Sequence, residues 1–244
     1  MIQIQKKSEQ FNTTIFNGKF VVNKPVANGF SNTIAPYSNL FYWSHAIAIE
    51  DCEFPLHPHQ GFEIMTFILE GKVTHFDTAS KVWTPLETGD FQVIQSNKGI
   101  QHQERIAKGT SSFQIWFDPN FHQAIKQNSA YQDYHSKDFA TVIENEIKTT
   151  IYIGGHSKAF AMTPHLTIKK LMFDKQTRMS LQLKEDSSFT FYILSGSGSA
   201  NNQQIEKDDA IRVSNAKHLN IDFAGELFCI QTPTQLNYKP VWLT

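Results

Sequence analysis

Four side chains of the kinds that bind transition metals occur as two pairs in this sequence. His57 and His59 are two positions apart, and so are His102 and Glu104. Side chains two residues apart on an extended strand point to the same face, so each pair can reach a single point. Imidazole is the commonest protein ligand of transition metals. We therefore predict that the four side chains hold one metal ion.

The residues around each pair favour the extended backbone that this prediction needs. Pro58 restricts the residue before it to extended geometry. Gly61 permits a turn or a bulge ahead of the apolar run 62–69. Downstream, Gly89 and Asp90 are typical of a turn that opens a strand. Each pair therefore lies on a predicted strand.

The donor set limits the kind of metal. Three neutral imidazoles and one carboxylate suit iron, manganese, nickel, copper, cobalt or zinc better than calcium or magnesium, which prefer all-oxygen shells. A purely structural zinc site is less well matched, because such sites are usually closed and rich in cysteine. Glu63 is a second candidate for the carboxylate, since it follows His59 by four residues and shares the strand parity of His57. The spacing alone leaves both Glu63 and Glu104 open.

Short strand patterns separated by turn residues predict a β-sandwich or barrel. Residues 1–38 are expected to be mostly irregular, apart from a short hairpin at 14–22 with its turn at Asn17 and Gly18. Strands are expected at 40–49 and 64–69. A short helix is predicted at 120–126, with Asn120 as its N-cap. The polar stretch 128–136 is interpreted as a connector, which divides the chain into domains 1–135 and 136–244.

The second domain repeats the pattern of the first without its ligands. Residues 189–196 resemble 64–71, which is a faint internal duplication. Superposing the two segments places Gln182 and Lys184 where the first half has its pair of histidines. We therefore expect the second domain to lack the metal and to serve as a scaffold or as a wall of the entrance.

Composition limits the partners. The 244 residues carry a net charge of −1 and contain no basic run, which argues against direct nucleic-acid binding. No apolar stretch of about 18 residues is present to span a membrane, and the N-terminus lacks the apolar core of a signal peptide. The two cysteines, Cys52 and Cys229, are far apart in the sequence. A reduced, cytoplasmic protein is the simplest interpretation.

Several motifs between Trp43 and Pro119 resemble the pirin family of the cupin superfamily. They are His57-Pro58-His59-Gln60-Gly61-Phe62-Glu63, Leu69-Glu70-Gly71-Lys72-Val73-Thr74-His75-Phe76-Asp77, Gly89-Asp90, Asn97-Lys98-Gly99-Ile100-Gln101-His102-Gln103-Glu104 and Gln114-Ile115-Trp116-Phe117. The resemblance implies an all-β bicupin, with two jelly-roll barrels in tandem, a short helical connector and terminal strands exchanged between the halves. It also favours Glu104 over Glu63 as the carboxylate ligand. Gln60 and Asn97-Lys98 depart from the family pattern beside the site, which puts substrate preference in doubt.

The resemblance implies two functions of different classes. One is a quercetin 2,3-dioxygenase, in which a mononuclear metal, Fe(II) first among the candidates, holds a flavonol-type aromatic substrate beside dioxygen and Glu104 acts as general base. The other is a non-catalytic, redox-dependent regulator that binds a transcription factor or a metabolic enzyme, as a monomer or a dimer. An apolar cavity of about 300 Å3 or more at the metal would favour catalysis, and a sealed metal beneath a flat charged surface would favour regulation.

Overall fold

Runs of β-branched and aromatic residues, broken by glycine, asparagine and aspartate, form nineteen strands in the part of the chain that the structure describes. The structure is a computed structural model, which describes residues 1–30 and 33–243. Its one α-helix, α1 (Phe121–Ala124), has a single turn. Three 3-10 turns lie at Lys7–Glu9, Ser136–Asp138 and Val241–Leu243. The predicted all-β class with a short helical segment is confirmed.

The chain folds into two units, which we describe separately. The N-terminal unit comprises residues 11–138 together with 161–163 and 238–244. The C-terminal unit comprises residues 1–10, 139–160 and 164–237. The division into domains 1–135 and 136–244 stays a prediction, and the structure adds that the first ten residues belong to the C-terminal unit.

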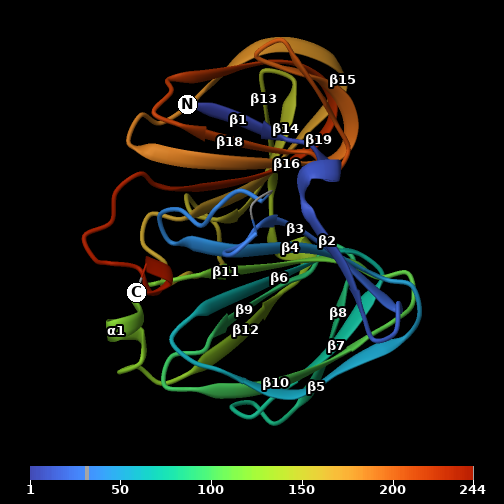
Figure 1. Cartoon of the computed structure of the whole chain (residues 1–244), viewed down its shortest axis with the longest axis vertical. Coiled ribbons are helices and arrows are strands. Elements are labelled where there is room, and N and C mark those ends of the chain that lie inside the picture. Colours follow the sequence, from blue (N-terminus) through green and yellow to red (C-terminus); the bar gives the residue numbers. More distant parts are fainter. Residues whose placement is uncertain (31–32, 244) are drawn as a thin grey trace. The chain divides into compact units, whose positions relative to one another are not determined.

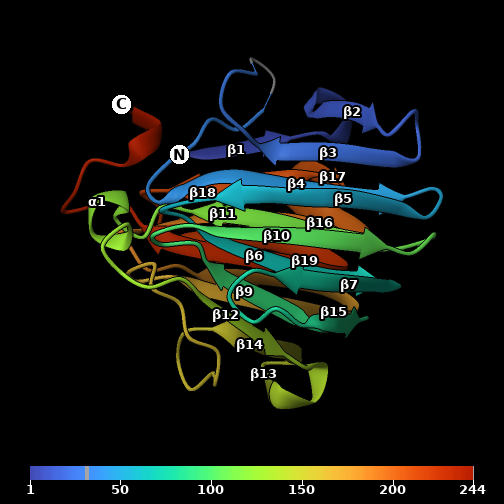
Figure 2. The same ribbon diagram turned by 90° about the horizontal axis from the view of Figure 1, so that it is seen from below.

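The N-terminal unit consists of two antiparallel sheets that face each other, as Figure 1 shows with β6 and β11 on one side and β5 and β10 on the other. The larger sheet has seven strands in the order β12-β9-β6-β11-β4-β3-β2. The smaller has four, β5-β10-β7-β8, and its first three run side by side in the view from below (Figure 2). The bounds are β2 (Phe11–Ile15), β3 (Phe20–Val26), β4 (Leu40–Ala48), β5 (Cys52–His59), β6 (Glu63–Glu70), β7 (Lys72–Asp77), β8 (Trp83–Glu87), β9 (Phe91–Gln95), β10 (Ile100–Ile106), β11 (Ser111–Phe117) and β12 (Ala130–Tyr134).

Apolar side chains from the inner faces of these sheets form the core at one end of the sandwich. Phe20 and Val22 of β3 pack with Ile68 of β6, Val73 of β7 and Ile106 of β10. Each of these side chains is at most 6% exposed. Because neighbouring residues of a strand face opposite sides, the alternation of inward and outward positions on these strands also decides which polar side chains enter the sandwich.

The C-terminal unit is built on one large antiparallel sheet with the order β1-β18-β16-β19-β15-β14-β13, and β17 pairs with β16. Its core includes Phe173, Phe191 and Phe223, which are at most 2% exposed. No α-helix in the described residues is long and apolar enough to cross a membrane. The bounds are β1 (Ile2–Gln5), β13 (Thr141–Glu144), β14 (Ile147–Ile153), β15 (Thr167–Gln182), β16 (Ser187–Ala200), β17 (Gln203–Glu206), β18 (Ala210–Ser214) and β19 (His218–Pro233).

The same turn occurs once in each unit, which supports the internal duplication predicted from the sequence. Asp90 and Asp209 each accept a side-chain hydrogen bond of 3.0 Å from the backbone N–H three residues earlier. The carbonyl of each aspartate accepts a further bond of 3.0 Å, from the N–H of Ile68 in one unit and of Ile193 in the other. The two aspartates therefore fix equivalent strand ends.

Two local predictions were wrong. The first 38 residues are not mostly irregular, because β1, β2 and β3 all lie there; the short polar-apolar alternation of these strands is easily mistaken for a loop. Asn120 makes no side-chain cap for α1 and lies at φ 83°. Instead, Oδ1 of Asp118 accepts hydrogen bonds from the N–H groups of Asn120 and Phe121, at 2.8 and 2.6 Å.

Candidate metal centre

The pairing of β5 with β10 brings the two predicted ligand pairs onto one inner face. His102 lies opposite His57 in the register, whereas Glu104 lies opposite Phe54. Between these two pairs, one residue of β10, Gln103, lies opposite two residues of β5, so β5 carries a bulge at Pro55 and Leu56. Both of those side chains are exposed. The bulge changes the parity of β5, and Phe54 and His57 can therefore both face inward.

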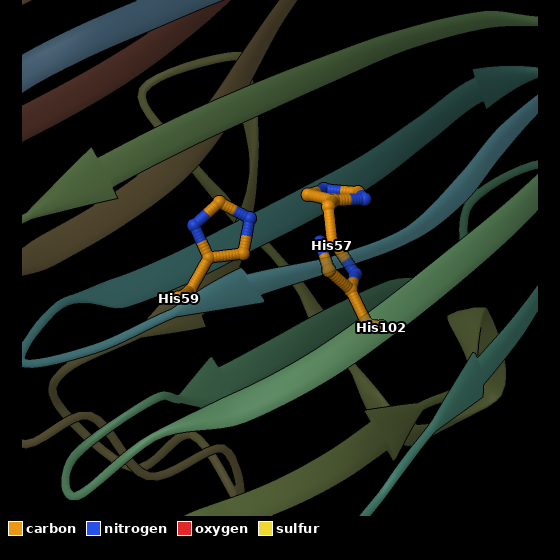
Figure 3. A group of neighbouring side chains, drawn as sticks. All are labelled: His57, His59 and His102. Atoms are coloured by element: carbon orange, nitrogen blue, oxygen red, sulfur yellow. The ribbon is translucent and has the colours of Figure 1, made fainter.

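The three imidazoles lie against one another, as Figure 3 shows. Their candidate ligand nitrogens are all within 4.8 Å of each other. The ring centroid of His57 is 5.0 Å from that of His59 and 4.3 Å from that of His102, and the remaining pair is 4.9 Å apart. His57 and His59 are half-buried and His102 has no exposed surface. The structure therefore brings together three of the four predicted ligands.

Hydrogen bonding leaves these rings free to bind a cation. Nδ1 of His57 lies 2.7 Å from the carbonyl oxygen of Pro55, which can only accept, so Nδ1 carries the proton and Nε2 keeps its lone pair. Both ring nitrogens of His102 are buried without a hydrogen-bond partner. An unpartnered buried polar group is costly in a folded protein unless something else satisfies it. A metal ion would do so here, and the residues present fit one.

Electrostatics also favour neutral imidazoles at this point. Burial, followed by repulsion from His57, lowers the pKa of His59 to about 4. Burial, together with repulsion from the neighbouring histidines, lowers the pKa of His102 to about 2. Rings that resist protonation at neutral pH keep the lone pairs that a metal requires.

Glu104 lies beside the three imidazoles without joining their cluster. It faces the same inner side of β10 as His102 and is 4% exposed. Its carboxylate is not among the groups whose ligand atoms fall within 4.8 Å of one another in the described residues. Burial raises the pKa of Glu104 to about 7. Its role as the fourth ligand and as general base stays a prediction.

Glu63, the alternative carboxylate, is occupied elsewhere. It has no exposed surface, and its oxygens accept hydrogen bonds from the backbone N–H groups of Met162 and Thr163, at 2.7 and 2.9 Å. The hydroxyl of Thr163 donates a third bond of 2.6 Å, and Nε2 of Gln95 a fourth of 3.2 Å. Burial raises the pKa of Glu63, and these bonds oppose the shift. A carboxylate held by four donors has little capacity left for a metal.

His75 is buried next to the cluster but does not belong to it. Its ring stacks on Tyr131, with centroids 4.7 Å apart, and lies 5.4 Å from the ring of His102. Neither of its nitrogens has a hydrogen-bond partner, so it is not the hydrogen-bonded histidine that its position in a strand would suggest. Burial lowers its pKa to about 4.

A cavity of about 320 Å3 opens onto the candidate site from inside the N-terminal unit. His57, His59 and Glu104 line it from the smaller sheet, and β2, β3, β4, β6 and β11 contribute the facing wall. The indole of Trp116 stands edge-on to His59, with centroids 5.1 Å apart and an interplanar angle of 76°. The lining is mostly apolar, which is typical of a pocket for a small organic ligand.

Sequence reasoning missed most of the cavity wall. Lys24, Ser44 and Thr66 received no role from the sequence, and Gln114 and Trp116 appeared only within a motif shared with the pirin family. A signal existed in β11, where Ser112 and Gln114 alternate with the apolar residues Phe113 and Ile115. Polar residues at the inward positions of a strand indicate a cavity instead of a packed core. That signal is readable only after the inward face of the strand is known.

Comparisons with known proteins show a similar sequence segment and a similar fold. Residues 26–117 match the sequence model of the Pirin family. A Zymomonas mobilis protein is 37% identical over 100 residues, which are 40% of this chain and 42% of that protein. The quercetin 2,3-dioxygenase of Escherichia coli is 33% identical over 93 residues, 36% of this chain and 37% of that protein. The chain thus spans about two fifths of the length of these curated relatives.

A solved structure matches over almost the whole chain. It is the bacterial pirin YhhW of Escherichia coli in complex with nickel(II), with a TM-score of 0.78 and 18% identity, and the match covers 96% of this chain and all of that one. At this identity the likeness shows the fold. The matched sequence segment contains the three clustered histidines and Glu104. Residues 26–117 thus match the Pirin family by sequence, and the chain has a fold like that of the solved bacterial pirin.

Proposed function

We propose that the protein is a metal-dependent dioxygenase that acts on flavonol-type aromatic substrates. The observation that supports this most strongly is the cavity of about 320 Å3 that reaches His57 and His59. Its volume lies within the range of about 300–1,000 Å3 typical of small-molecule sites. A regulator with a sealed metal would have no need of such a space.

The proposed metal is Fe(II), held by His57, His59, His102 and Glu104. When bound, such an ion supplies Lewis acidity and a redox-active centre beside an electron-rich substrate. Zinc, nickel, manganese, cobalt and copper suit the same donors. The names of several relatives support a dioxygenase, and the nickel in the bacterial pirin structure concerns that protein only.

The side chains around the proposed metal would bind the substrate and transfer its proton. Trp116 and the apolar wall offer a flat surface for an aromatic ring and exclude water. Glu104 lines the cavity, and its proposed role is to accept the proton of an incoming hydroxyl. Without a metal, burial raises its pKa to about 7; a bound cation would lower that pKa and favour the ionised form that accepts a proton.

The test is direct. Purified protein loaded with Fe(II) should consume oxygen and bleach the absorbance of quercetin. His59→Ala should abolish both signals, whereas His122→Ala, which changes an exposed histidine on α1, should preserve them. Absence of turnover with every one of the six candidate metals would end the proposal and leave the regulatory function as the one to pursue.

A further inference from the structure

Lys24 places a positive charge in the wall of the cavity. It lies on β3, where Phe20 and Val22 at the two preceding alternate positions also line the cavity. β3 belongs to the seven-stranded sheet and His57 to the facing four-stranded sheet. Facing sheets pack about 10 Å apart. A flat ligand between them therefore has imidazoles on one side and an ammonium group on the other.

Aromatic rings surround the Lys24 ammonium, and no carboxylate does. Nζ lies 5.5 Å from the ring centroids of Phe11 and Phe30 and 5.2 Å from that of Tyr42. Within the described residues, no aspartate or glutamate forms an ion pair with Lys24, whereas Lys72, on β7 of the same unit, forms one with Glu87. Aromatic faces attract a cation without neutralising it.

The charge of the cavity is therefore unbalanced. Among the described residues that line it, Lys24 is the one lysine and Glu104 is the one carboxylate. A divalent metal bound by three neutral imidazoles and Glu104 would leave one further positive charge. Burial already lowers the pKa of Lys24, which shows that its charge is partly desolvated. An anion in the cavity would offset that cost.

Thr66 adds an independent polar contact deeper in the same cavity. Its side chain lines the cavity, is 4% exposed, and its hydroxyl has no hydrogen-bond partner. Ser44, 3% exposed, lines the cavity as well. A buried hydroxyl without a partner is satisfied when a ligand brings a polar oxygen to it. The cavity is thus matched to an aromatic compound that carries oxygen substituents on more than one side.

We propose that Lys24 is a specificity-determining residue that selects aromatic ligands with an anionic oxygen, a carboxylate or an ionised phenol, on the side away from the metal. The inference rests on the proposed function for the site and names its substrate class. The anionic oxygen pairs with the Lys24 ammonium, while a hydroxyl at the opposite end of the ligand lies toward the imidazoles.

The experiment uses two matched probes and zinc-loaded protein in oxygen-free buffer, so that no oxygen-dependent turnover can occur. 6-Hydroxy-2-naphthoate and 6-hydroxy-2-naphthamide differ in the charge of one group, and isothermal titration calorimetry at pH 7.5 measures both dissociation constants. Wild-type protein is expected to bind the acid about tenfold more tightly than the amide. Lys24→Met, which keeps a long apolar side chain against the rings, should remove that preference and leave amide binding within about twofold.

Two further variants make the result decisive. Lys24→Arg should retain the preference for the acid, and Lys108→Met, a matched change at an exposed lysine outside the cavity, should leave it unchanged. A preference that survives Lys24→Met would overturn the inference, because the acid would then be bound by the metal. Equal affinities in the wild type would overturn it too. Neither result depends on oxygen or turnover, so failure of the dioxygenase assay is distinguishable from failure here.

Discussion

Thr163 donates two hydrogen bonds to one oxygen of Glu63, from its backbone N–H at 2.9 Å and from its hydroxyl at 2.6 Å. The two residues are a hundred positions apart, and both are buried within the N-terminal unit. The contact fixes the segment 161–163 against the first strand after the histidine motif. Glu63 therefore has a structural role, although its position in the sequence made it a candidate ligand.

Replacing Glu63 tests that role. Glu63→Gln turns two acceptor oxygens into one acceptor and one donor, so the amide NH2 would face the N–H group of either Met162 or Thr163. We expect a loss of ~2–3 kcal/mol in the free energy of unfolding, measured by urea denaturation. Glu70→Gln, an exposed change on the same strand, should be nearly neutral. Unchanged stability together with loss of bound metal would instead make Glu63 a ligand.

Metal binding itself is expected to depend on the buried histidine of the cluster. His102→Ala removes a ring that lies within 5 Å of both other imidazoles. Elemental analysis should show about one transition-metal ion per wild-type chain and a small fraction of that in the variant. His122→Ala is the matched control. Full metal content in His102→Ala would place the ion elsewhere.

Glu104 can be separated from the imidazoles by a conservative change. Glu104→Gln keeps the shape of the side chain and removes its charge and basicity. We expect weaker metal binding and a fall in quercetin turnover of at least about a hundredfold. Normal metal affinity with lost turnover would restrict Glu104 to proton transfer. Normal values of both would leave a site of three histidines.

The metal-free protein should lose stability on acidification below pH 6.5. The pKa values of His59 and His75 are lowered by burial to about 4, and that of His102 to about 2. In the unfolded chain these rings take up protons near pH 6.5. Their contribution to the stability of the fold is therefore present above that pH and is lost as the pH falls toward their pKa values in the folded protein.

Glu104 changes the stability in the opposite direction, because its pKa is raised in the folded state. Its contribution to the stability of the fold is complete below about pH 4.5 and is lost as the pH rises through 7. The combined effect of the three imidazoles on stability is larger than that of Glu104. We therefore expect the melting temperature to fall by about 5 °C between pH 7 and 5. His75→Phe, which keeps the stack on Tyr131, should make the dependence shallower. A melting temperature that rises on acidification would contradict this balance.

The spacing of the ligands was predictable from the sequence, and their surroundings were not. His57 and His59 share a face by strand parity alone, and so do His102 and Glu104. The bulge at Pro55 depends on pairing with β10, which no local pattern shows. The family resemblance then gave the bicupin architecture, which the structure confirms.

The residues that were missed have their roles through tertiary contacts. From its neighbours in the sequence, Lys24 would be predicted to be an exposed charge. The three aromatic rings around it lie on β2, on β4 and in the loop that follows β3, all of them distant in the sequence or outside its own strand. The sequence position of Glu63 predicts a metal ligand, and its structural role becomes visible only through its hydrogen bonds with residues 162 and 163. Neither contact has a signature within a few residues along the chain.

The pairing of β1 with β18 has a consequence for biosynthesis. Ile2 lies opposite Val213, and Lys6 and Lys7 form ion pairs with Asp209 and Asp208 at 2.7 and 2.5 Å. Strand β1 must therefore wait until more than two hundred further residues have been synthesised before its partner strand exists. The N-terminal unit can fold during that interval, while the unpaired β1 stays open to aggregation or to chaperones.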